Sequence, residues 1–258
     1  MSLVYSDNKE YHIGLKKGDA GRYVILPGDP GRCEKIASRF ESPVFIGSNR
    51  EYTTYTGTLC GEKVSVVSTG IGGPSAAIAL EELVHIGADT FIRVGTSGGM
   101  QPEVEAGHLV IASGAIRLDG TGREYAPIEY PAVADFAVTN ALYEAARSLG
   151  MTTHLGVVQC KDSFYGQHSP ETMPVSQKLK EDWDAWIKCG ALTSEMESAT
   201  LFIVGAVRRV RVGSVLAVIG NQTRREMGLP ETLCHDTDYA VDTAVEAIKI
   251  LINQDKMR

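Results

Sequence analysis

The sequence predicts an α/β protein, with three α/β/α layers around a central mixed β-sheet. The first observation behind this prediction is that short apolar runs, typical of buried strands, alternate along the chain with segments of helical periodicity. Such alternation predicts a mostly parallel or mixed sheet that helices cover on both faces. The second observation is that no proline- or serine-rich tract, charge block or low-complexity run interrupts the 258 residues. We therefore expect a single domain over residues 1–258.

The expected strands and helices follow one another in order along the chain. Buried strands are predicted at residues 23–26, 63–68, 90–94, 108–113, 154–160 and 212–219. Helices are predicted at residues 74–86, 134–149, 195–208 and 238–253. Pro74 suits the first position of its helix, and Ser194 is a candidate N-cap for the helix that begins at Glu195.

Four glycine-rich segments are expected to form tight turns beside these strands. They are residues 27–32, 69–75, 95–99 and 220–223. In an open α/β sheet, ligands bind outside the carboxyl ends of the strands, where such turns gather. We therefore expect several of these turns to line one pocket.

Charge and composition exclude several classes of protein. A formal net charge of -7 argues against nucleic acid as a partner, because binding to a phosphate backbone requires a basic face. The five cysteines are odd in number and form no CxxC pair, which indicates a reduced, cytoplasmic protein. Residues 1–12 lack the apolar core of a signal peptide, and no apolar run reaches the ~20 residues of a membrane span. The histidines show no metal-ligand spacing, so metal catalysis is not expected.

Arg93 is the first candidate functional residue, because it lies within an apolar strand. A buried guanidinium is costly unless an anion or a hydrogen-bonded partner meets it. The segment after it offers the Thr96 and Ser97 hydroxyls and several backbone N–H groups, from which α/β proteins build phosphate sites. Arg32 and Arg50, each taken alone, are more typical of surface or salt-bridge residues. Three guanidiniums that converge on one dianion would give the bidentate geometry that phosphate prefers.

Gly70, Gly72 and Ser75 form a near match to the G-x-G-x-x-G fingerprint of dinucleotide-binding proteins. The third glycine is a serine, and the next strand leads to Arg93 rather than to the acidic residue that a Rossmann site needs. A tight strand-to-helix turn is the better interpretation, and a nucleotide cofactor is not expected.

Glu195, Met196 and Glu197 are expected at the start of a helix. Acidic residues are common in a first turn because they complement the helix dipole, which accounts for one glutamate. Carboxylates two residues apart point to different sides, with the apolar methionine between them. One carboxylate could therefore accept hydrogen bonds from the vicinal hydroxyls of a sugar while the methionine packs on the sugar face.

Five segments occur in an order and spacing that match a known family. They are Gly28-Asp29-Pro30 with Arg32, Asn49-Arg50-Glu51, Ser68-Thr69-Gly70-Ile71-Gly72-Gly73-Pro74-Ser75, Arg93-Val94-Gly95-Thr96-Ser97-Gly98 and Glu195-Met196-Glu197-Ser198-Ala199-Thr200. Together they resemble the nucleoside phosphorylase-I family, closest to its uridine-cleaving members, from about His12 to the C-terminal helix. The resemblance implies a pentosyltransferase of nucleoside salvage that needs no cofactor. It would split a pyrimidine ribonucleoside with phosphate, its co-substrate, into the free base and ribose 1-phosphate.

The resemblance also implies roles for individual residues. The implied phosphate site consists of Gly28, Arg32, Arg50, Arg93, Thr96 and Ser97. The implied ribose site consists of His12, Thr96, Glu195, Met196 and Glu197, with the histidine reaching the ribose of a neighbouring subunit. Arg93 and Glu197 are implied to be catalytic, since they position phosphate and bind the ribose hydroxyls as charge develops. Family members are hexamers, built as trimers of dimers, and in some of them the positions of Glu51, Ile71 and Ser75 hold potassium.

Residues 160–169 align with the base-recognition loop of the family. Phe164 is expected to stack on uracil, and the Gln167 amide to hydrogen-bond its O/N–H edge. Gly98, Ile219 and Gly220 complete the base site that the resemblance implies.

This loop departs from the usual family pattern, because it is one residue shorter and lacks the arginine that follows the glutamine. A second arginine, expected near Gln222, is also missing. Lys161 and His168 are the nearest cationic or proton-donating side chains. We expect one of them to act on a carbonyl of the base as a general acid or electrostatic partner, against the alternative of a solvated lysine and a loop histidine. Asn221 stands about where related purine phosphorylases carry a proton-donating aspartate, so a pyrimidine is favoured.

Three other functions stay open at this stage. A nucleosidase of the same fold would cleave the bond with water and would not need Arg32, Arg50 and Arg93 together. A purine nucleoside phosphorylase is disfavoured by Asn221. A non-catalytic nucleoside- or dinucleotide-binding protein is supported only by the glycine turn at Gly70.

Overall fold

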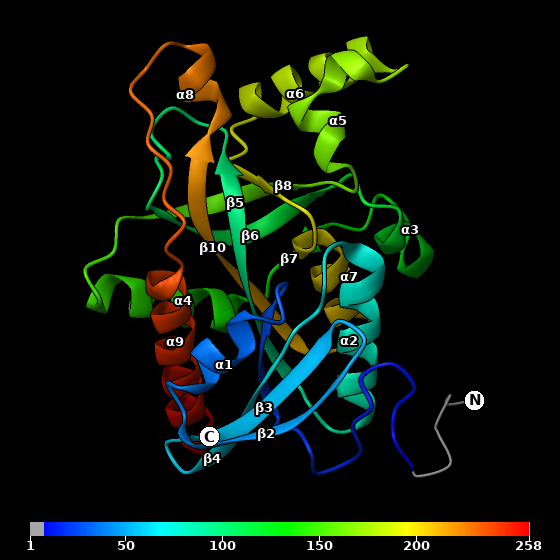
Figure 1. Cartoon of the computed structure of the whole chain (residues 1–258), viewed down its shortest axis with the longest axis vertical. Helices are drawn as coiled ribbons and strands as arrows, with labels where there is room; N and C mark the ends of the chain where they lie inside the picture. Colours follow the sequence, from blue (N-terminus) through cyan, green and yellow to red (C-terminus); the bar gives the residue numbers. More distant parts are fainter. Residues whose placement is uncertain (1–7, 258) are drawn as a thin grey trace.

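The computed structural model describes residues 8–257 and has the predicted α/β architecture, with helices on both faces of a mixed sheet (Figure 1). The ends of the expected domain, residues 1–7 and 258, lie outside the described residues. The strands are β1 Tyr23–Pro27, β2 Glu41–Asn49, β3 Tyr52–Leu59, β4 Glu62–Val67, β5 Thr90–Gly99, β6 Leu109–Arg117, β7 Ala132–Val133, β8 Thr153–Cys160, β9 Thr193–Glu195 and β10 Arg211–Asn221. The helices are α1 Arg32–Ala37, α2 Gly73–His85, α3 Thr121–Tyr125, α4 Phe136–Ser148, α5 Phe164–His168, α6 Ser176–Lys188, α7 Ser198–Arg208, α8 Gln222–Glu226 and α9 Asp238–Lys256, with a 3-10 turn at Pro170–Thr172.

Strand β5 lies at the junction of the sheet. The strands follow the order β10-β6-β8-β9-β5-β1-β4-β3-β2, and β10 also pairs with β5, so five of them close into a ring. Strand β5 pairs with the parallel strand β10 along one edge. Along its other edge it pairs first with β1, which is parallel, and then with β9, which is antiparallel. Side chains at the carboxyl end of β5 therefore meet residues from β1, β9 and β10.

Alternating side chains of β5 serve two different core clusters. Phe91 packs with α2 and α7, whereas Ile92 and Val94 pack with α4 and α9 on the opposite face. Because successive strand residues point to opposite faces, Arg93 shares the face of Phe91. The sequence thus directs the buried guanidinium toward the N-terminus of α7.

One expected turn is wrong: residues 95–99 continue strand β5 to Gly99. This segment pairs with β10 as far as Asn221, through a register shift between Val218 and Gly220. Its glycines provide room rather than a change of direction. A Cβ on Gly95 would lie 2.6 Å from Arg93 Nη2, and one on Gly99 would lie 2.5 Å from the carbonyl oxygen of Val104.

The predicted start of the 195–208 helix is also wrong, because α7 begins at Ser198. Residues 193–195 instead form β9, in which Ser194 pairs with Gly98 of β5 and Glu195 pairs with Cys160 of β8. Ser194 is therefore not an N-cap. The N-cap residue is Glu197, and the carboxylate of Glu195, two residues earlier, accepts the backbone N–H groups of Glu197 and Ser198 at 3.0 Å. Sheet pairing overrides the local helical pattern here.

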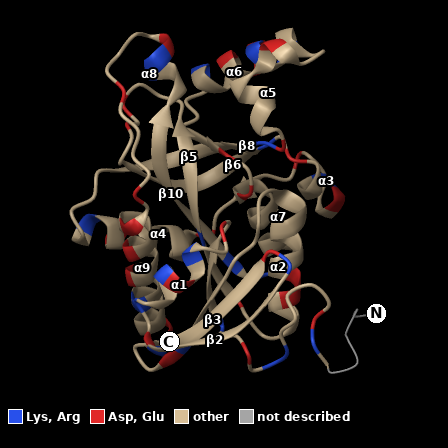
Figure 2. Cartoon of the chain, viewed as in Figure 1, with Lys and Arg blue, Asp and Glu red and all other residues tan. Residues whose placement is uncertain are grey.

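The remaining predicted elements are present with shifted ends, and several others were not predicted. Strand β2 forms the sheet edge and is exposed along most of its length, and four of the eight residues of its partner β3 are threonines, so neither strand resembles a buried apolar strand. Acidic and basic residues are both scattered over the helices and loops (Figure 2). Within residues 8–257, no helix combines the length and apolar character that a membrane crossing requires.

Candidate active site

A cavity of about 850 Å³ opens at the carboxyl ends of β1, β5 and β10. Seven parts of the chain line it, and the four predicted glycine-rich segments are among them: residues 28–32, 70–71, 93–98, 161–168, 194–197, 219–225 and 233–235. The predicted site residues that line it are Gly28, Arg32, Ile71, Arg93, Thr96, Ser97, Gly98, Lys161, Phe164, Gln167, His168, Glu195, Met196, Glu197, Ile219 and Gly220. A single pocket therefore contains residues predicted for phosphate, ribose and base.

Two residues predicted for the phosphate and ribose sites, His12 and Arg50, do not line this cavity. His12 Nδ1 lies 2.6 Å from Glu82 Oε1, and the same carboxylate accepts the backbone N–H of His12. Arg50 is exposed, with its guanidinium over the ring of Tyr11.

Arg93 is held between two glutamates at the floor of the cavity. Its Nε donates to Glu195 Oε2 at 2.9 Å, and its Nη2 forms an ion pair with Glu197. All three side chains are at most 5% exposed. Burial opposes the charge of Arg93, but the carboxylates of Glu197 and Glu195 outweigh it and raise the pKa of the guanidinium.

Glu197 is fixed from two directions. Its Oε1 accepts the backbone N–H of Gly72 at 2.5 Å, and Arg93 holds the other oxygen. Gly72 has φ +93°, a conformation that favours glycine. Burial and the nearby Glu195 raise the pKa of Glu197, although Arg93 opposes this shift. The carboxylate is oriented toward the cavity with few alternative rotamers.

Arg32 supplies a second positive charge beside the first. It begins α1 and lines the cavity, and its guanidinium forms no ion pair or hydrogen bond with any group in residues 8–257. Burial lowers the pKa of its guanidinium; Asp29 opposes this shift and the like charge of Arg93 adds to it. A partly buried cation without a partner next to another cation favours an anionic ligand between them.

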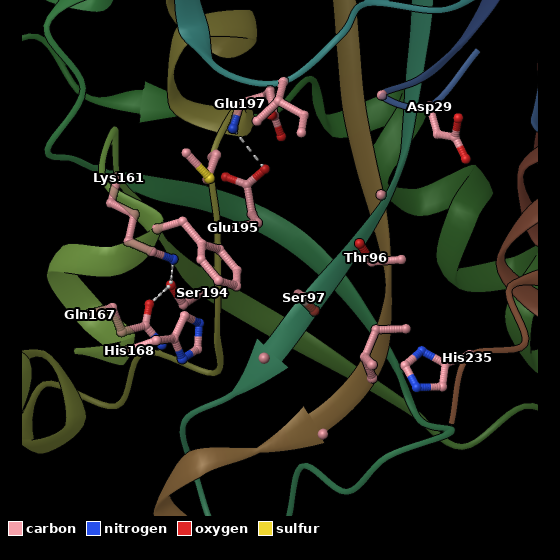
Figure 3. Close-up of a pocket in the computed structure, with 18 of the residues that line it drawn as sticks. Asp29, Thr96, Ser97, Lys161, Gln167, His168, Ser194, Glu195, Glu197 and His235 are labelled. Atoms are coloured by element: carbon pink, nitrogen blue, oxygen red, sulfur yellow. Dashed lines mark hydrogen bonds between the residues drawn. The ribbon is translucent and has the colours of Figure 1, made fainter. Parts of the chain in front are cut away.

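The base end of the cavity contains a hydrogen-bonded group around Ser194 (Figure 3). Lys161 Nζ donates to Ser194 Oγ at 2.5 Å, and Ser194 Oγ donates to Gln167 Oε1 at 2.8 Å. Phe164 lies beside this group, with its ring centroid 4.3 Å from that of His168. Burial lowers the pKa of Lys161 to about 8, and burial together with Lys161 lowers the pKa of His168.

Asn221 is engaged in structure rather than directed at a ligand. Its Oδ1 accepts the N–H of Arg224 at the start of α8, and its Nδ2 donates to the carbonyls of Gln101 and Val104. All of its side-chain groups are therefore used within the protein. The sequence favours a pyrimidine over a purine because of Asn221. Since this side chain is occupied within the protein, other residues must select the base.

Several cavity residues were not predicted as site residues. They are Asp29, Ser194, Asn221, Gln222, Arg225, Leu233 and His235. His235 comes from the segment between α8 and α9 and lies near Thr96 in Figure 3. Arg225 places a guanidinium three residues after the expected position near Gln222. No motif marks Leu233 and His235, because the segment between α8 and α9 that carries them has neither apolar periodicity nor a glycine-rich turn of the kind found at the other lining segments.

Of the three residues predicted to hold potassium, Glu51 and Ser75 are in contact. Ser75 Oγ donates to Glu51 Oε1 at 2.7 Å, which lowers the pKa of the Glu51 carboxyl. Ile71, by contrast, is 78% exposed on the rim of the cavity. No group of three or more histidine, cysteine, aspartate or glutamate side chains in the described part of the chain could hold a metal ion.

The fold and the cavity define a class of protein: an α/β protein with one cavity in which two guanidinium groups lie beside two buried carboxylates. Comparison with known proteins gives the family. Residues 22–252 match the model of the phosphorylase superfamily. The chain is 65% identical to the uridine phosphorylase of Treponema pallidum over all of both chains. It is 44% identical to the uridine phosphorylase of Klebsiella aerogenes over 96% of this chain and 100% of that one.

A more distant relative has a different name. The guanosine phosphorylase of Halorubrum lacusprofundi is 34% identical over 95% of this chain and 97% of its own. The chain thus belongs to the phosphorylase superfamily, which confirms the resemblance drawn from its five segments.

Proposed function

We propose that this protein catalyses the reversible phosphorolysis of uridine to uracil and ribose 1-phosphate. The single observation that carries the proposal is the arrangement around Arg93, which has the unpaired Arg32 on one side and the Glu197 carboxylate on the other. An anion bound by the arginines would therefore lie next to a sugar whose hydroxyls bind Glu197. The names of the relatives at 65% and 44% identity support the same activity.

The anion in this proposal is phosphate. Arg32, Arg93, the backbone at Gly28 and the hydroxyls of Thr96 and Ser97 surround one end of the cavity. One phosphate oxygen attacks C1′ of the ribose as the bond from C1′ to N1 of the base breaks, and the bond electrons leave with N1. The arginines position the nucleophile and neutralise it, so no covalent enzyme intermediate is required.

The ribose lies between phosphate and base, against Met196 and Glu197, with Glu195 behind them. Positive charge develops on the sugar as the glycosidic bond breaks. Hydrogen bonds from the ribose hydroxyls to Glu197 strengthen as that charge develops, which favours the transition state over the substrate. Gly72 and Arg93 keep this carboxylate in place.

The departing base carries the negative charge. Phe164 stacks on its face, Gln167 reads its O/N–H edge, and Gly98, Ile219 and Gly220 complete its pocket. Lys161 and His168 stand in for the arginines that the family pattern expects. With a pKa of about 8, the Lys161 ammonium is protonated at neutral pH and can donate to a base carbonyl.

Each active site is proposed to need a second subunit, within a hexamer built as a trimer of dimers. His12 and Arg50 lie outside their own cavity, which supports a role in that of a neighbour. The edge strand β2 exposes Val44 and Phe45, at 57% and 54%. Ile71 is exposed on the rim of the cavity. Apolar side chains of this size favour burial against another chain.

Glu51, Ile71 and Ser75 are proposed to hold a potassium ion at the contact between two subunits. A carboxylate, a backbone carbonyl and a hydroxyl are oxygen donors of the kind that hard cations prefer. The Glu51–Ser75 contact brings two of the three together. Bound there, the ion would supply positive charge at the subunit contact rather than chemistry at the base.

One assay separates the proposed activity from its alternatives. Loss of uridine is measured with and without phosphate, alongside deoxyuridine, thymidine and guanosine. Phosphate-dependent release of uracil supports the proposal. Release without phosphate would favour a nucleosidase, guanosine cleavage alone would favour a purine phosphorylase, and the absence of cleavage would favour a binding protein.

A further inference from the structure

Ser194 is the centre of a buried hydrogen-bond junction at the base end of the cavity. It receives a hydrogen bond from Lys161 Nζ, and its hydroxyl meets the side-chain oxygens of both Gln159 and Gln167. Ser194, Lys161 and Gln159 are 4%, 8% and 5% exposed. The junction therefore connects, away from bulk water, two side chains that the proposed function assigns to the base.

The direction of each hydrogen bond follows from the chemistry of the groups. An ammonium can only donate, so Ser194 Oγ accepts from Lys161. The single hydrogen of the hydroxyl must then be donated to an amide oxygen, of Gln159 or of Gln167. The Gln167 amide places its oxygen 2.8 Å from Ser194 Oγ and its nitrogen 3.4 Å from Gln222 Oε1. When the hydroxyl donates to Gln167, it therefore fixes which end of this amide meets each part of the base.

The backbone of Ser194 is rigid because strands hold it on both sides. It pairs with Gly98 of β5 and with Gln159 of β8. Lys161, by contrast, follows β8 and carries its charge on a flexible four-carbon side chain. The contact with a fixed hydroxyl restricts that side chain to one position beside Gln167 (Figure 3).

We propose that Ser194 is a positioning residue that holds the Lys161 ammonium and the Gln167 amide in the orientation needed to read the carbonyl and N–H edge of the base. This inference rests on the proposed function and deepens it, because it names the group that fixes base recognition. Ser194 acts through Lys161 and Gln167 and does not itself have to touch the substrate.

The charge on Lys161 provides a measurable sign of this role. Burial lowers its pKa to about 8, while Glu195, the Cys160 thiol and Glu197 oppose the shift; His168 faces the ammonium from α5. The Ser194 oxygen is an acceptor that favours the charged form. Loss of this oxygen should lower the pKa of Lys161 further, so the ammonium would lose its proton at a lower pH.

The test is the pH dependence of kcat/KM for phosphate-dependent uridine cleavage by the full-length protein and its Ser194→Ala variant. We expect kcat/KM at pH 7 to fall by about 10-fold or more, as for a lost hydrogen bond to a charged group. The decline of activity at alkaline pH should begin at a lower pH in this variant. Ser194→Thr, which keeps the hydroxyl, should keep the wild-type decline.

Ser65→Ala is the matched control. Ser65 is a fully buried serine on β4 that accepts the Gly21 N–H at 2.9 Å and contacts the Thr56 hydroxyl at 2.8 Å, and it does not line the cavity. This variant should change neither kcat/KM nor its pH dependence. Thermal unfolding of each variant shows whether it is folded.

Two results would overturn the inference. One is a kcat/KM of Ser194→Ala within twofold of that of wild type, and the other is a lower kcat/KM whose alkaline decline begins at the same pH as in wild type. If Ser194→Ala does not fold, Ser194→Cys takes its place, because a thiol is a weak acceptor and should move the decline in the same direction. A wild-type protein that does not cleave uridine with phosphate would instead refute the proposed function. The two failures are therefore distinguishable.

Discussion

Arg93 and Glu197 form a buried ion pair at the floor of the cavity, and Glu195 holds the same guanidinium from its other side. One positive charge therefore faces two negative charges. Arg93 alone cannot offer surplus positive charge to a phosphate dianion. The unpaired Arg32 has to supply part of it, and an arginine from a second chain would supply more.

Replacement of Arg93 by leucine should destabilise the fold strongly. Without the guanidinium, Glu195 and Glu197 are left as two buried carboxylates with no cation between them. Breaking a buried pair from one side costs about 3–5 kcal/mol, which urea unfolding at pH 7 and constant protein concentration would measure. Arg22→Leu is the control, since its ion pair with Asp89 is nearly half exposed on both sides and should be worth at most ~1 kcal/mol. Equal effects of the two replacements would contradict the prediction.

Gly95→Ala should weaken phosphate binding in particular. The added methyl group would lie 2.6 Å from Arg93 Nη2 and 2.8 Å from Leu216 Cδ2, so the guanidinium has to move. We expect the KM for phosphate to rise about 10-fold, a loss of ~1.4 kcal/mol, with a smaller change in the KM for uridine. Gly47→Ala, which meets no atom within 4 Å, should leave both values unchanged. A uniform change in both KM values would argue against a specific effect on Arg93.

The position of Arg93 could be predicted from the sequence because it depends on local rules. Its strand is apolar, and alternation along that strand directs Arg93 to the face opposite Ile92 and Val94. The position of Glu195 could not be predicted. Its local pattern is that of a first helical turn, and only pairing with Cys160, 35 positions earlier in the chain, makes it the end of a strand.

The base end shows the same limit more clearly. The sequence singles out Lys161 and Gln167, but it predicts a helix cap at Ser194. Its actual neighbours come from β5 and β8, so its role depends on sheet register. Register follows from long-range pairing, which residue spacing within one segment does not encode.

Lys161→Met should remove the alkaline decline of activity. Because the pKa of Lys161 is about 8, the wild-type ammonium loses its proton, and activity falls, as pH rises through this value. Methionine has no proton to lose, so the variant should show a low kcat/KM without this decline. Rates measured between pH 6 and 10 test the prediction. A variant that retains the wild-type decline would assign it to another group.

The same lysine should affect stability with a definite sign. Its pKa is about 8 in the folded protein and near 10.5, its ordinary value, in the unfolded chain. Between these values the unfolded chain binds more protons, so stability from this group rises with pH over that window. The free energy of unfolding of wild type relative to Lys161→Met should therefore be higher at pH 9.5 than at pH 7.5. A difference that is constant with pH would contradict a lowered pKa.

Subunits with different defects should restore each other if each site takes His12 from a neighbouring chain. His12→Ala and Glu197→Gln are each expected to be nearly inactive, because every site in either protein lacks one group. After the two are unfolded together and refolded at equal concentration, half of the dimers are hybrids, and one of the two sites in each hybrid has both groups. Activity should therefore recover to about a quarter of that of wild type. Arg32→Ala mixed with Glu197→Gln is the control, since both residues line the cavity of their own chain and no hybrid site is intact. Recovery in the control, or none in the His12 mixture once hybrids are shown by affinity tags, would refute a site shared between two chains.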